Sequence, residues 1–168
     1  MTEPASVVSD GNVRVQWVPS IADPEAPNAL ECNDPTGLDA TCYLTDSGWA
    51  PAMSEDTVAD ARLCSRQTFT RPGRNQRTIP LVYVYNPELP SDDEARLTFV
   101  DRAIGFFVAR WGDDFERPFA AGDIVDVYPV QLGATNKNAA TANTPLTIMQ
   151  TGYVRAPGAQ IDVMVTAS

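Results

Sequence analysis

The densest run of apolar positions lies in the middle of the chain, between Arg77 and Gly112. Residues 78–85 are rich in β-branched and aromatic side chains, which predicts a strand, and apolar residues fall on both of its faces. Residues 105–111 show the same two-sided pattern and end at a Gly-Asp-Asp turn signal. Both strands therefore need cover on each face. On the first strand, one face is expected to carry Ile79, Leu81, Tyr83 and Tyr85.

A short helix is predicted between these two strands. Ser91 and Glu94 follow a proline and have the spacing of a capping box. Leu97, Val100 and Ile104 recur at helical spacings of three and four, so they would form the buried stripe. The central stretch is therefore predicted to form a strand, a helix and a strand.

Further strand patterns flank this centre. Residues 13–18 alternate between apolar and polar side chains, as in a strand with one face in water. Residues 123–132 predict another strand, in which Pro129 suggests a sheet edge or a bulge. Residues 146–155 and 160–166 flank Ala-Pro-Gly-Ala, a hairpin turn sequence. These last two strands are therefore expected to pair antiparallel with each other.

The segments between the strands are long and polar. Residues 1–11 predict a flexible N-terminal arm, and residues 19–41 predict a long surface loop because Pro, Asp, Asn and Gly recur in them. Residues 42–49 suggest a short hairpin. Residues 51–78 predict an extended segment with a turn at Arg-Pro-Gly-Arg, 71–74. Loops of this length are uncommon in a compact domain unless they are functional, for example by contacting another chain.

Together these patterns predict a mainly β protein. Its seven to eight strands would form a β-sandwich or barrel, with one short α-helix on its flank and extended loops or arms. With 168 residues the chain has the size of a single domain, 1–168, which is long enough to bury a core without disulfide staples.

The charge balance is strongly acidic. The formal net charge is -10, from 22 acidic and 12 basic residues. Such a surface is unsuited to holding duplex DNA, because affinity for phosphate comes mostly from Lys and Arg. The same charge would repel a polyanion that passes nearby, and simple solubility is the alternative explanation.

The sequence offers little for catalysis or metal binding. It contains no histidine, which removes the usual general base and the commonest metal ligand, and Lys137 is its only lysine. The three cysteines include no C-x-x-C pair and give neither zinc-ligand spacing nor a disulfide framework. We therefore predict no enzyme, no catalytic or metal site and no cofactor. Idle thiols are expected at Cys42, Cys64 and Cys32, with a Cys32–Cys42 bridge as the alternative.

No apolar run approaches the roughly eighteen residues that would indicate a membrane-spanning helix, and the N-terminus lacks a secretory pattern. No membrane insertion is therefore expected.

One dense cluster of positive charge stands out. It could be a solvated hairpin tip, or the electrostatic partner of acidic residues elsewhere, as where copies of one chain stack head to tail. Its members are Arg66, Arg71, Arg74 and Arg77.

Several phrases of the sequence, in their order, resemble a known family. They are NVRVQWVPSIADPEAP, CYLTDSGWAP, FTRPGR, LVYVYNP, the acid-capped helix and GFFVARWG. Together they resemble the major tail proteins, or tail tube proteins, of long-tailed bacteriophages, particularly those that infect actinobacteria. The resemblance covers roughly residues 12–166 and rests on layout rather than on one invariant motif.

The resemblance implies a structural virion protein of the tail that is assembled in the host cytoplasm. Six copies would form a ring, the inner sheets would join into one barrel, and the rings would stack into a hollow tube for the passage of double-stranded DNA. The tape measure, tail tip and terminator proteins would be its other partners. A ring of six would carry a charge of -60 (6 × -10). Both termini and the segments 19–41 and 51–78 would then reach neighbouring subunits.

The resemblance also gives candidate residues. Inter-subunit contacts are expected at the basic cluster and at two tryptophans, Trp17 and Trp49. Asp123 and Asp126 fall on opposite faces of a predicted strand, so at most one of them would face the channel without a bulge. Ordinary solvated surface is the alternative for every acidic candidate. The candidate lumen-facing acids are Asp123, Asp126, Glu55, Asp56 and Asp60.

Three other functions are compatible with parts of the sequence. A head-tail joining or tail terminator protein would form a single ring and would lack stacking arms. A β-sandwich binding or decoration module would show exposed ligand sites. A carboxylate-based enzyme would need two acids in one cleft, whereas the acids here fall in turns, helix caps and loops.

Overall fold

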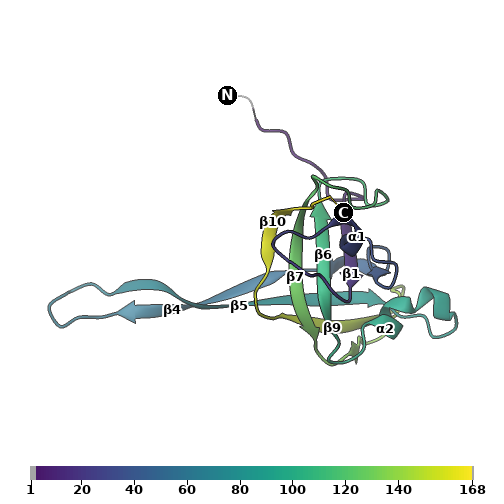
Figure 1. Ribbon diagram of the computed structural model, residues 1–168. Helices are drawn as coiled ribbons and strands as arrows, with labels where there is room; N and C mark the ends of the chain where they lie inside the picture. Colours follow the sequence, from purple (N-terminus) through teal and green to yellow (C-terminus); the bar gives the residue numbers. More distant parts are fainter. Residues whose placement is uncertain (1–2, 168) are drawn as a thin grey trace.

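The computed structural model describes residues 3–167, and these form one ten-stranded sheet that curls back on itself (Figure 1). The mainly β prediction is confirmed, and two short α-helices are present in the described part instead of one. The sheet order is β2-β1-β6-β7-β9-β5-β3, with β10 on β7, β4 on β5 and β8 on β9. The elements are β1 (Val13–Val18), α1 (Ala29–Cys32), β2 (Leu38–Asp39), β3 (Leu44–Trp49), β4 (Ala52–Asp60), β5 (Phe69–Val84), the 3-10 helix η1 (Pro90–Asp92), α2 (Glu94–Thr98), β6 (Ile104–Trp111), β7 (Ile124–Leu132), β8 (Asn136–Lys137), β9 (Thr147–Val154) and β10 (Gln160–Met164).

The inner core lies between the two halves of the curled sheet. Trp17 of β1 and Phe107 of β6 meet edge to face, with ring centroids 4.9 Å apart. They pack against the buried face of β5, as the alternating pattern predicted, because every second side chain of a strand points the same way. That face carries Ile79, Leu81 and Tyr83.

A second core covers the outer face of the same sheet. Val108 and Val125 point outward from β6 and β7 and are buried under Ile21, Cys32 and Phe119. The segment 19–41 is therefore not a free surface loop, which corrects that prediction. Its apolar side chains cover the sheet.

Local hydrogen bonds fix this covering segment. Asn28 and Glu31 form a reciprocal capping box at the start of α1. The Asn33 amide nitrogen donates to the carbonyl oxygens of Ala29 and Phe119, and its oxygen accepts from the Phe119 N–H. The cover is thus joined to the loop that follows β6.

The helix between β5 and β6 begins later than predicted. A 3-10 turn occupies the expected first turn, Ser91 forms no cap, and α2 begins only at Glu94. The predicted stripe is wrong, because its three members are about half exposed: Leu97, Val100 and Ile104.

The buried side chains of this segment are instead those of Ala95 and Phe99. The Phe99 ring contacts Trp17, Tyr83 and Phe107 at centroid distances of 5.7, 5.5 and 5.6 Å. Because α2 has only five residues, Val100 and Ile104 lie beyond its end, while Leu97 lies within it on the exposed face.

The predicted hairpin at 42–49 is a single strand, β3, paired with β5. Its Gly48 is needed for close approach to the neighbouring strand, since an added Cβ would lie 2.0 Å from the Val82 carbonyl oxygen. The turn-like composition of this stretch therefore reflects an irregular strand pairing.

β9 and β10 do not pair with each other, which corrects the predicted hairpin. Both lie along the same edge of β7, with 152–154 opposite 130–132 and β10 opposite 124–127. Pro129 lies at the break between these two partners, and its carbonyl accepts from the Arg155 N–H at 2.8 Å. In a strand, the N–H and C=O of one residue point toward the same neighbouring strand. The N–H that Pro129 lacks would therefore point into the break between β9 and β10, so no ladder hydrogen bond is lost there.

Candidate functional site

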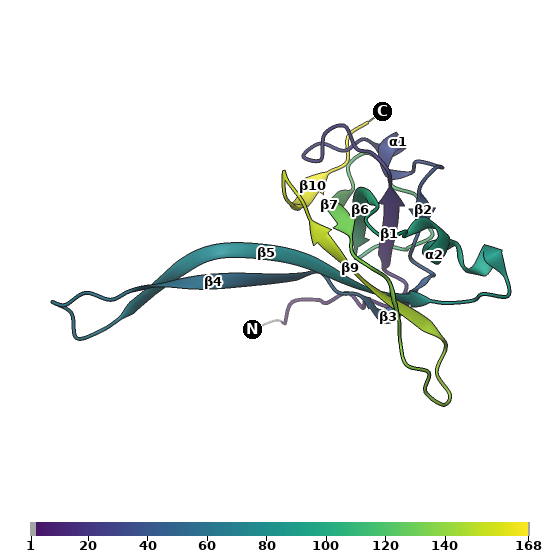
Figure 2. The same ribbon diagram turned by 90° about the horizontal axis from the view of Figure 1, so that it is seen from below.

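The most prominent feature outside the body is a long two-stranded arm, residues 52–77. It consists of β4, the connection 61–68 and the first half of β5 (Figures 1 and 2). The strands pair from Ala52 opposite Thr78 to Asp60 opposite Phe69. Since β5 continues without a break into the body, the arm extends a core strand.

The predicted turn at 71–74 lies inside a strand. Glu55 pairs with Asn75, and Thr57 pairs with Pro72, so β5 holds one extra residue there and forms a bulge. Gly73 fits this bulge because a Cβ would lie 2.9 Å from the Asp56 carbonyl oxygen. The chain reverses direction instead at residues 61–68, which contain no Gly or Pro that would predict a turn.

Both faces of the arm are in water. Phe69 is 60% exposed, and Leu63 in the connection is fully exposed; Met53 and Val58 are also exposed. A two-stranded ribbon with no packed face is marginally stable in water, and its outer strand has an open edge. This surface therefore has the properties of one that is covered by another chain.

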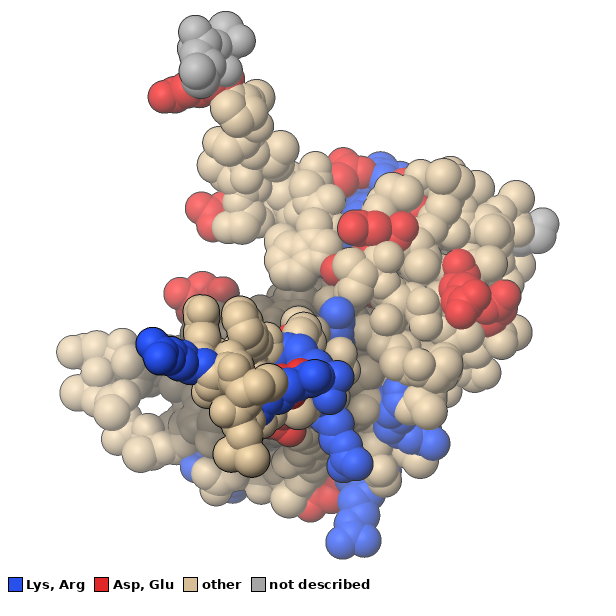
Figure 3. Space-filling view, turned by 90° about the vertical axis from the view of Figure 1, so that its left-hand side faces the viewer, with Lys and Arg blue, Asp and Glu red and all other residues tan. Residues whose placement is uncertain are grey.

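The arm carries charge opposite to that of the body. It holds five arginines and three acids, a net charge of +2 (5 − 3), which leaves -12 (7 − 19) on the rest of the chain. Figure 3 looks along the arm toward the body and shows basic side chains, all of them arginines, gathered on it. Arg62 pairs with Asp60, whereas within residues 3–167 the predicted basic cluster makes no ion pair: Arg66, Arg71, Arg74 and Arg77.

The acidic candidates separate into two groups. Glu55, Asp56 and Asp60 lie on β4 of the arm. The first two are exposed to water and Asp60 is partly buried. Asp126 and Asp123 belong to internal networks, which corrects the expectation that either is an exposed carboxylate.

Asp126 lies on the inner face of β7 and is 8% exposed. Its carboxylate accepts hydrogen bonds from Trp111 Nε1 at 2.9 Å, from the Tyr128 hydroxyl at 3.3 Å and from the Asp162 N–H at 3.0 Å. Burial and this nearby carboxylate raise the pKa of Tyr128. Asp126 thus connects β6, β7 and β10.

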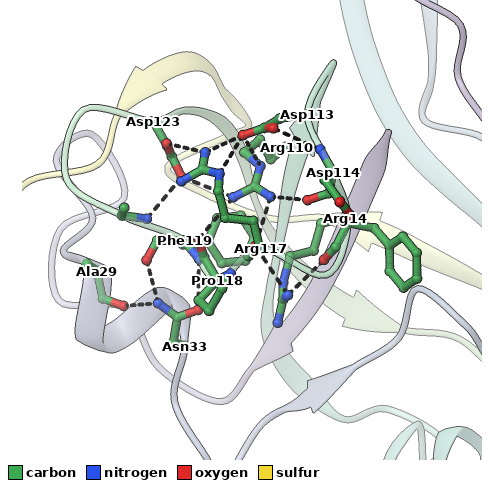
Figure 4. Close-up of polar contacts among 12 residues, drawn as sticks. Arg14, Ala29, Asn33, Arg110, Asp113, Asp114, Arg117, Pro118, Phe119 and Asp123 are labelled. Atoms are coloured by element: carbon green, nitrogen blue, oxygen red, sulfur yellow. Dashed lines mark hydrogen bonds and ion pairs between the residues drawn. The ribbon is translucent and has the colours of Figure 1, made fainter. Parts of the chain in front are cut away.

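Asp123 precedes β7 and is held by two arginines (Figure 4). Arg110 Nη1 lies 3.0 Å and Arg117 Nη2 lies 2.7 Å from its two oxygens, and the Ala120 N–H donates at 2.9 Å. Burial alone would raise the pKa of Asp123. The hydrogen bonds from Arg117, Ala120 and Arg110 outweigh it, so the pKa is lowered.

Arg110 organises the loop that follows β6. Its guanidinium donates to the carbonyl oxygens of Asp114, Arg117 and Pro118 at 2.7, 2.8 and 3.2 Å (Figure 4). It also lies 5.3 Å from the Phe119 ring centroid. Sequence reasoning missed this residue, although an arginine within an otherwise apolar strand is a signal that it has internal partners.

The two candidate tryptophans differ in how far they are buried in their own subunit. Trp17 is 5% exposed, so its ring has little surface for another subunit, which corrects that expectation. Trp49 is half-buried and packs its ring on Phe107 and Tyr128 at 5.3 and 5.8 Å. The sequence pattern had indicated a core position for Trp17, because Val13, Val15 and Trp17 occupy every second position and so share one face of the strand.

All three cysteines are free thiols, so the alternative bridge is absent. Cys32 is buried, while Cys42 and Cys64 are exposed. Over residues 3–167 no cluster of acidic and cysteine side chains could hold a metal ion. None of the helices in this range has the length and apolar character needed to cross a bilayer.

A solved structure with a similar fold is the cryo-EM structure of the anti-feeding prophage (AFP) baseplate, 6-fold symmetrised. The TM-score is 0.51 at 9% sequence identity, and the alignment covers 95% of this chain and 96% of that chain. At this identity the likeness shows a shared fold over nearly the full length of both chains.

The sequence matches the family model described as phage tail tube protein over residues 1–167. The chain therefore belongs to the phage tail tube protein family, a family of structural tail components and not of enzymes. No curated protein compared with the chain matches its sequence.

Proposed function

We propose that this chain is the tail tube subunit of a long-tailed phage with an actinobacterial host, and that it acts as a single domain over 1–168. Six copies form a ring, rings stack into a hollow tube, and phage DNA passes through the tube during ejection. The tape measure, tail tip and terminator proteins bind to this tube. The family match and the similar fold support a structural role in the tail.

The observation that carries the stacking proposal is the arm. Its exposed faces, open edge and positive charge suit contact with a further copy of the chain. A subunit of a single joining or terminator ring would have no need of such an arm. The segment 19–41, by contrast, covers its own body and is a weaker candidate for reaching a neighbour.

The net charge supports passage of DNA without binding. Some of the -60 charge of a ring of six would face the channel and repel phosphates within about one Debye length, roughly 8 Å at physiological salt. Glu55 and Asp56 remain the exposed lumen candidates, with Asp60 partly buried beside them. The four unpaired arginines of the arm suit contacts between subunits better than a channel wall, where they would hold DNA.

The test is electron microscopy of the purified full chain, concentrated and incubated alone. Regular hollow tubes are expected for the wild type. A matched variant lacks residues 57–72, which leaves Asp56 followed by Gly73, an Asp-Gly pair that favours a tight hairpin turn. This variant is expected to keep the far-UV circular dichroism of the body and to form no tubes.

Other outcomes separate the alternatives. Isolated rings without stacking, in both proteins, would favour a joining or terminator role. Compact monomers under every condition would favour a β-sandwich binding module. Tubes formed equally well without the arm would contradict its role in stacking.

A further inference from the structure

The end of the molecule opposite the arm is acidic. β5 has 16 residues and spans about 50 Å, at roughly 3.3 Å per residue, from the arm to the far side of the body (Figure 2). The chain that follows it, residues 86–94, contains four acids and no Lys or Arg. We define the acidic end as residues 86–101, which also includes α2.

Much of this acidic end is available for contact. Glu88, Asp92 and Glu94 are exposed, whereas Asp93 is buried beside Arg96. Glu88 makes no side-chain hydrogen bond or ion pair within the described chain. Exposed apolar side chains lie among the acids, at Leu89, Leu97 and Val100.

The arm has the complementary composition. Among residues 3–167, Arg62 is the one arm arginine that has an ion-pair partner. The exposed apolar residues Leu63, Val58 and Phe69 lie among these arginines. The arm thus combines apolar with basic residues, and the acidic end combines apolar with acidic residues. Opposite charges favour contact of an arm with an acidic end, and like charges disfavour contact of two arms or of two acidic ends.

We propose that the arm of one copy docks on the acidic end of the next copy. This inference rests on the proposed stacking and names the surface that receives the arm. The two surfaces lie at opposite ends of one continuous strand, so an arm cannot reach the acidic end of its own subunit (Figures 1 and 2). The contact is therefore head to tail, and a head-to-tail contact that does not close repeats along an axis.

Charge reversal of each surface, alone and together, tests the proposal. One variant is Glu88→Arg with Asp92→Arg, and the other is Arg71→Glu with Arg74→Glu. Each is expected to raise the concentration needed for tube formation by about tenfold or more, because attractive pairs become repulsive. The quadruple variant keeps the net charge of -10 and is expected to restore tubes, since the two surfaces are complementary again.

A matched control carries Glu25→Arg and Glu116→Arg, which are exposed residues outside both surfaces. It makes the same change in net charge as the acidic-end variant and is expected to assemble like the wild type. Far-UV circular dichroism of every variant checks the fold. If the acidic-end variant assembles like this control, the docking proposal is wrong while the tube proposal stands.

A second measurement does not depend on tubes. Arg71→Lys with Arg74→Lys keeps the charge and supplies amines, which a carbodiimide couples to carboxylates in direct contact. Mass spectrometry is expected to find the new lysines joined to Glu88 or Asp92 in cross-linked dimers, even if wild-type protein forms only transient pairs. Cross-links confined to carboxylates outside 86–101, or none at concentrations where dimers sediment, would overturn the docking proposal.

Discussion

Arg110 shows how one residue can fix a whole loop. Its side chain is 3% exposed, and every carbonyl oxygen that it binds lies in the chain between Asp114 and Pro118. Arg117 then joins Asp123 to Asp113, so a run of polar residues becomes an ordered cover for the outer core. A buried charge is tolerated there because both terminal nitrogens of the guanidinium donate hydrogen bonds and a carboxylate balances its charge.

This network predicts a pH-dependent effect of Asp123→Asn. The substitution removes charge-assisted hydrogen bonds from two arginines and is expected to lower the free energy of unfolding by about 2 kcal/mol at pH 7. The lowered native pKa of Asp123 means that its contribution is fully present above the unfolded value of about 3.9 and is lost as pH falls through the native pKa. The difference between variant and wild type in urea unfolding should therefore shrink below pH 4. A constant difference down to pH 2 would contradict this account.

The three thiols are expected to differ in reactivity. Burial in the outer core raises the pKa of Cys32 to about 12, whereas Cys42 and Cys64 are exposed. A thiol reagent at pH 8 should therefore modify two residues per native monomer and three in denaturant, since the thiolate is the nucleophile. Mass spectrometry of the labelled peptides checks the assignment, and rapid native labelling of Cys32 would argue against the outer core described here.

At the scale of elements, β5 has two different environments. Its second half lies between β3 and β9 and buries alternate side chains, while its first half pairs only with β4 and is exposed on both faces. One strand thus supplies both the core and the arm.

The segment around α2 allows a matched comparison of two apolar residues. Phe99 is fully buried among three aromatic rings, and Phe99→Ala is expected to cost about 3–5 kcal/mol of unfolding free energy. Leu97, two residues earlier, is 52% exposed, and Leu97→Ala should change stability by less than about 0.5 kcal/mol. Chemical denaturation of both variants checks the pair. Equal losses would mean that the helical stripe first expected from the sequence is the buried one.

At the scale of the whole molecule, charge is separated along β5. The arm has a net charge of +2 and the remaining chain -12, with four acids at the opposite end in residues 86–94. This arrangement gives each subunit a direction, which suits the head-to-tail contact proposed above.

Assembly is expected to protect one exposed thiol. Cys64 lies in the connection 61–68 of the arm, so it should react freely in the monomer and slowly in tubes if the arm is covered by the next subunit. Quantitative labelling before and after assembly measures this, with the Arg71→Glu and Arg74→Glu variant, which keeps Cys64, as the control for incomplete assembly. Unchanged labelling of Cys64 in tubes would show that the end of the arm stays in water.

The sequence alone determined the features that depend on local patterns. Alternation identified β1, and runs of apolar, β-branched and aromatic residues identified the body half of β5, β6 and β7. The lack of histidine and the acidic net charge favoured neither catalysis nor DNA binding. The strand predictions succeeded because side-chain period is a property of neighbouring residues, which a strand buries in a fixed order.

Only the tertiary structure decided which strands are neighbours and which polar residues are internal. Pro72-Gly73 has the composition of a turn but forms a bulge, because β4 pairs across it. β9 and β10 flank a turn sequence but pair with β7, and Asp123 is internal because Arg110 and Arg117 lie beside it in space. Long-range pairing overrides local turn preference, since each strand gains more from a full ladder and a buried face than a short hairpin can supply.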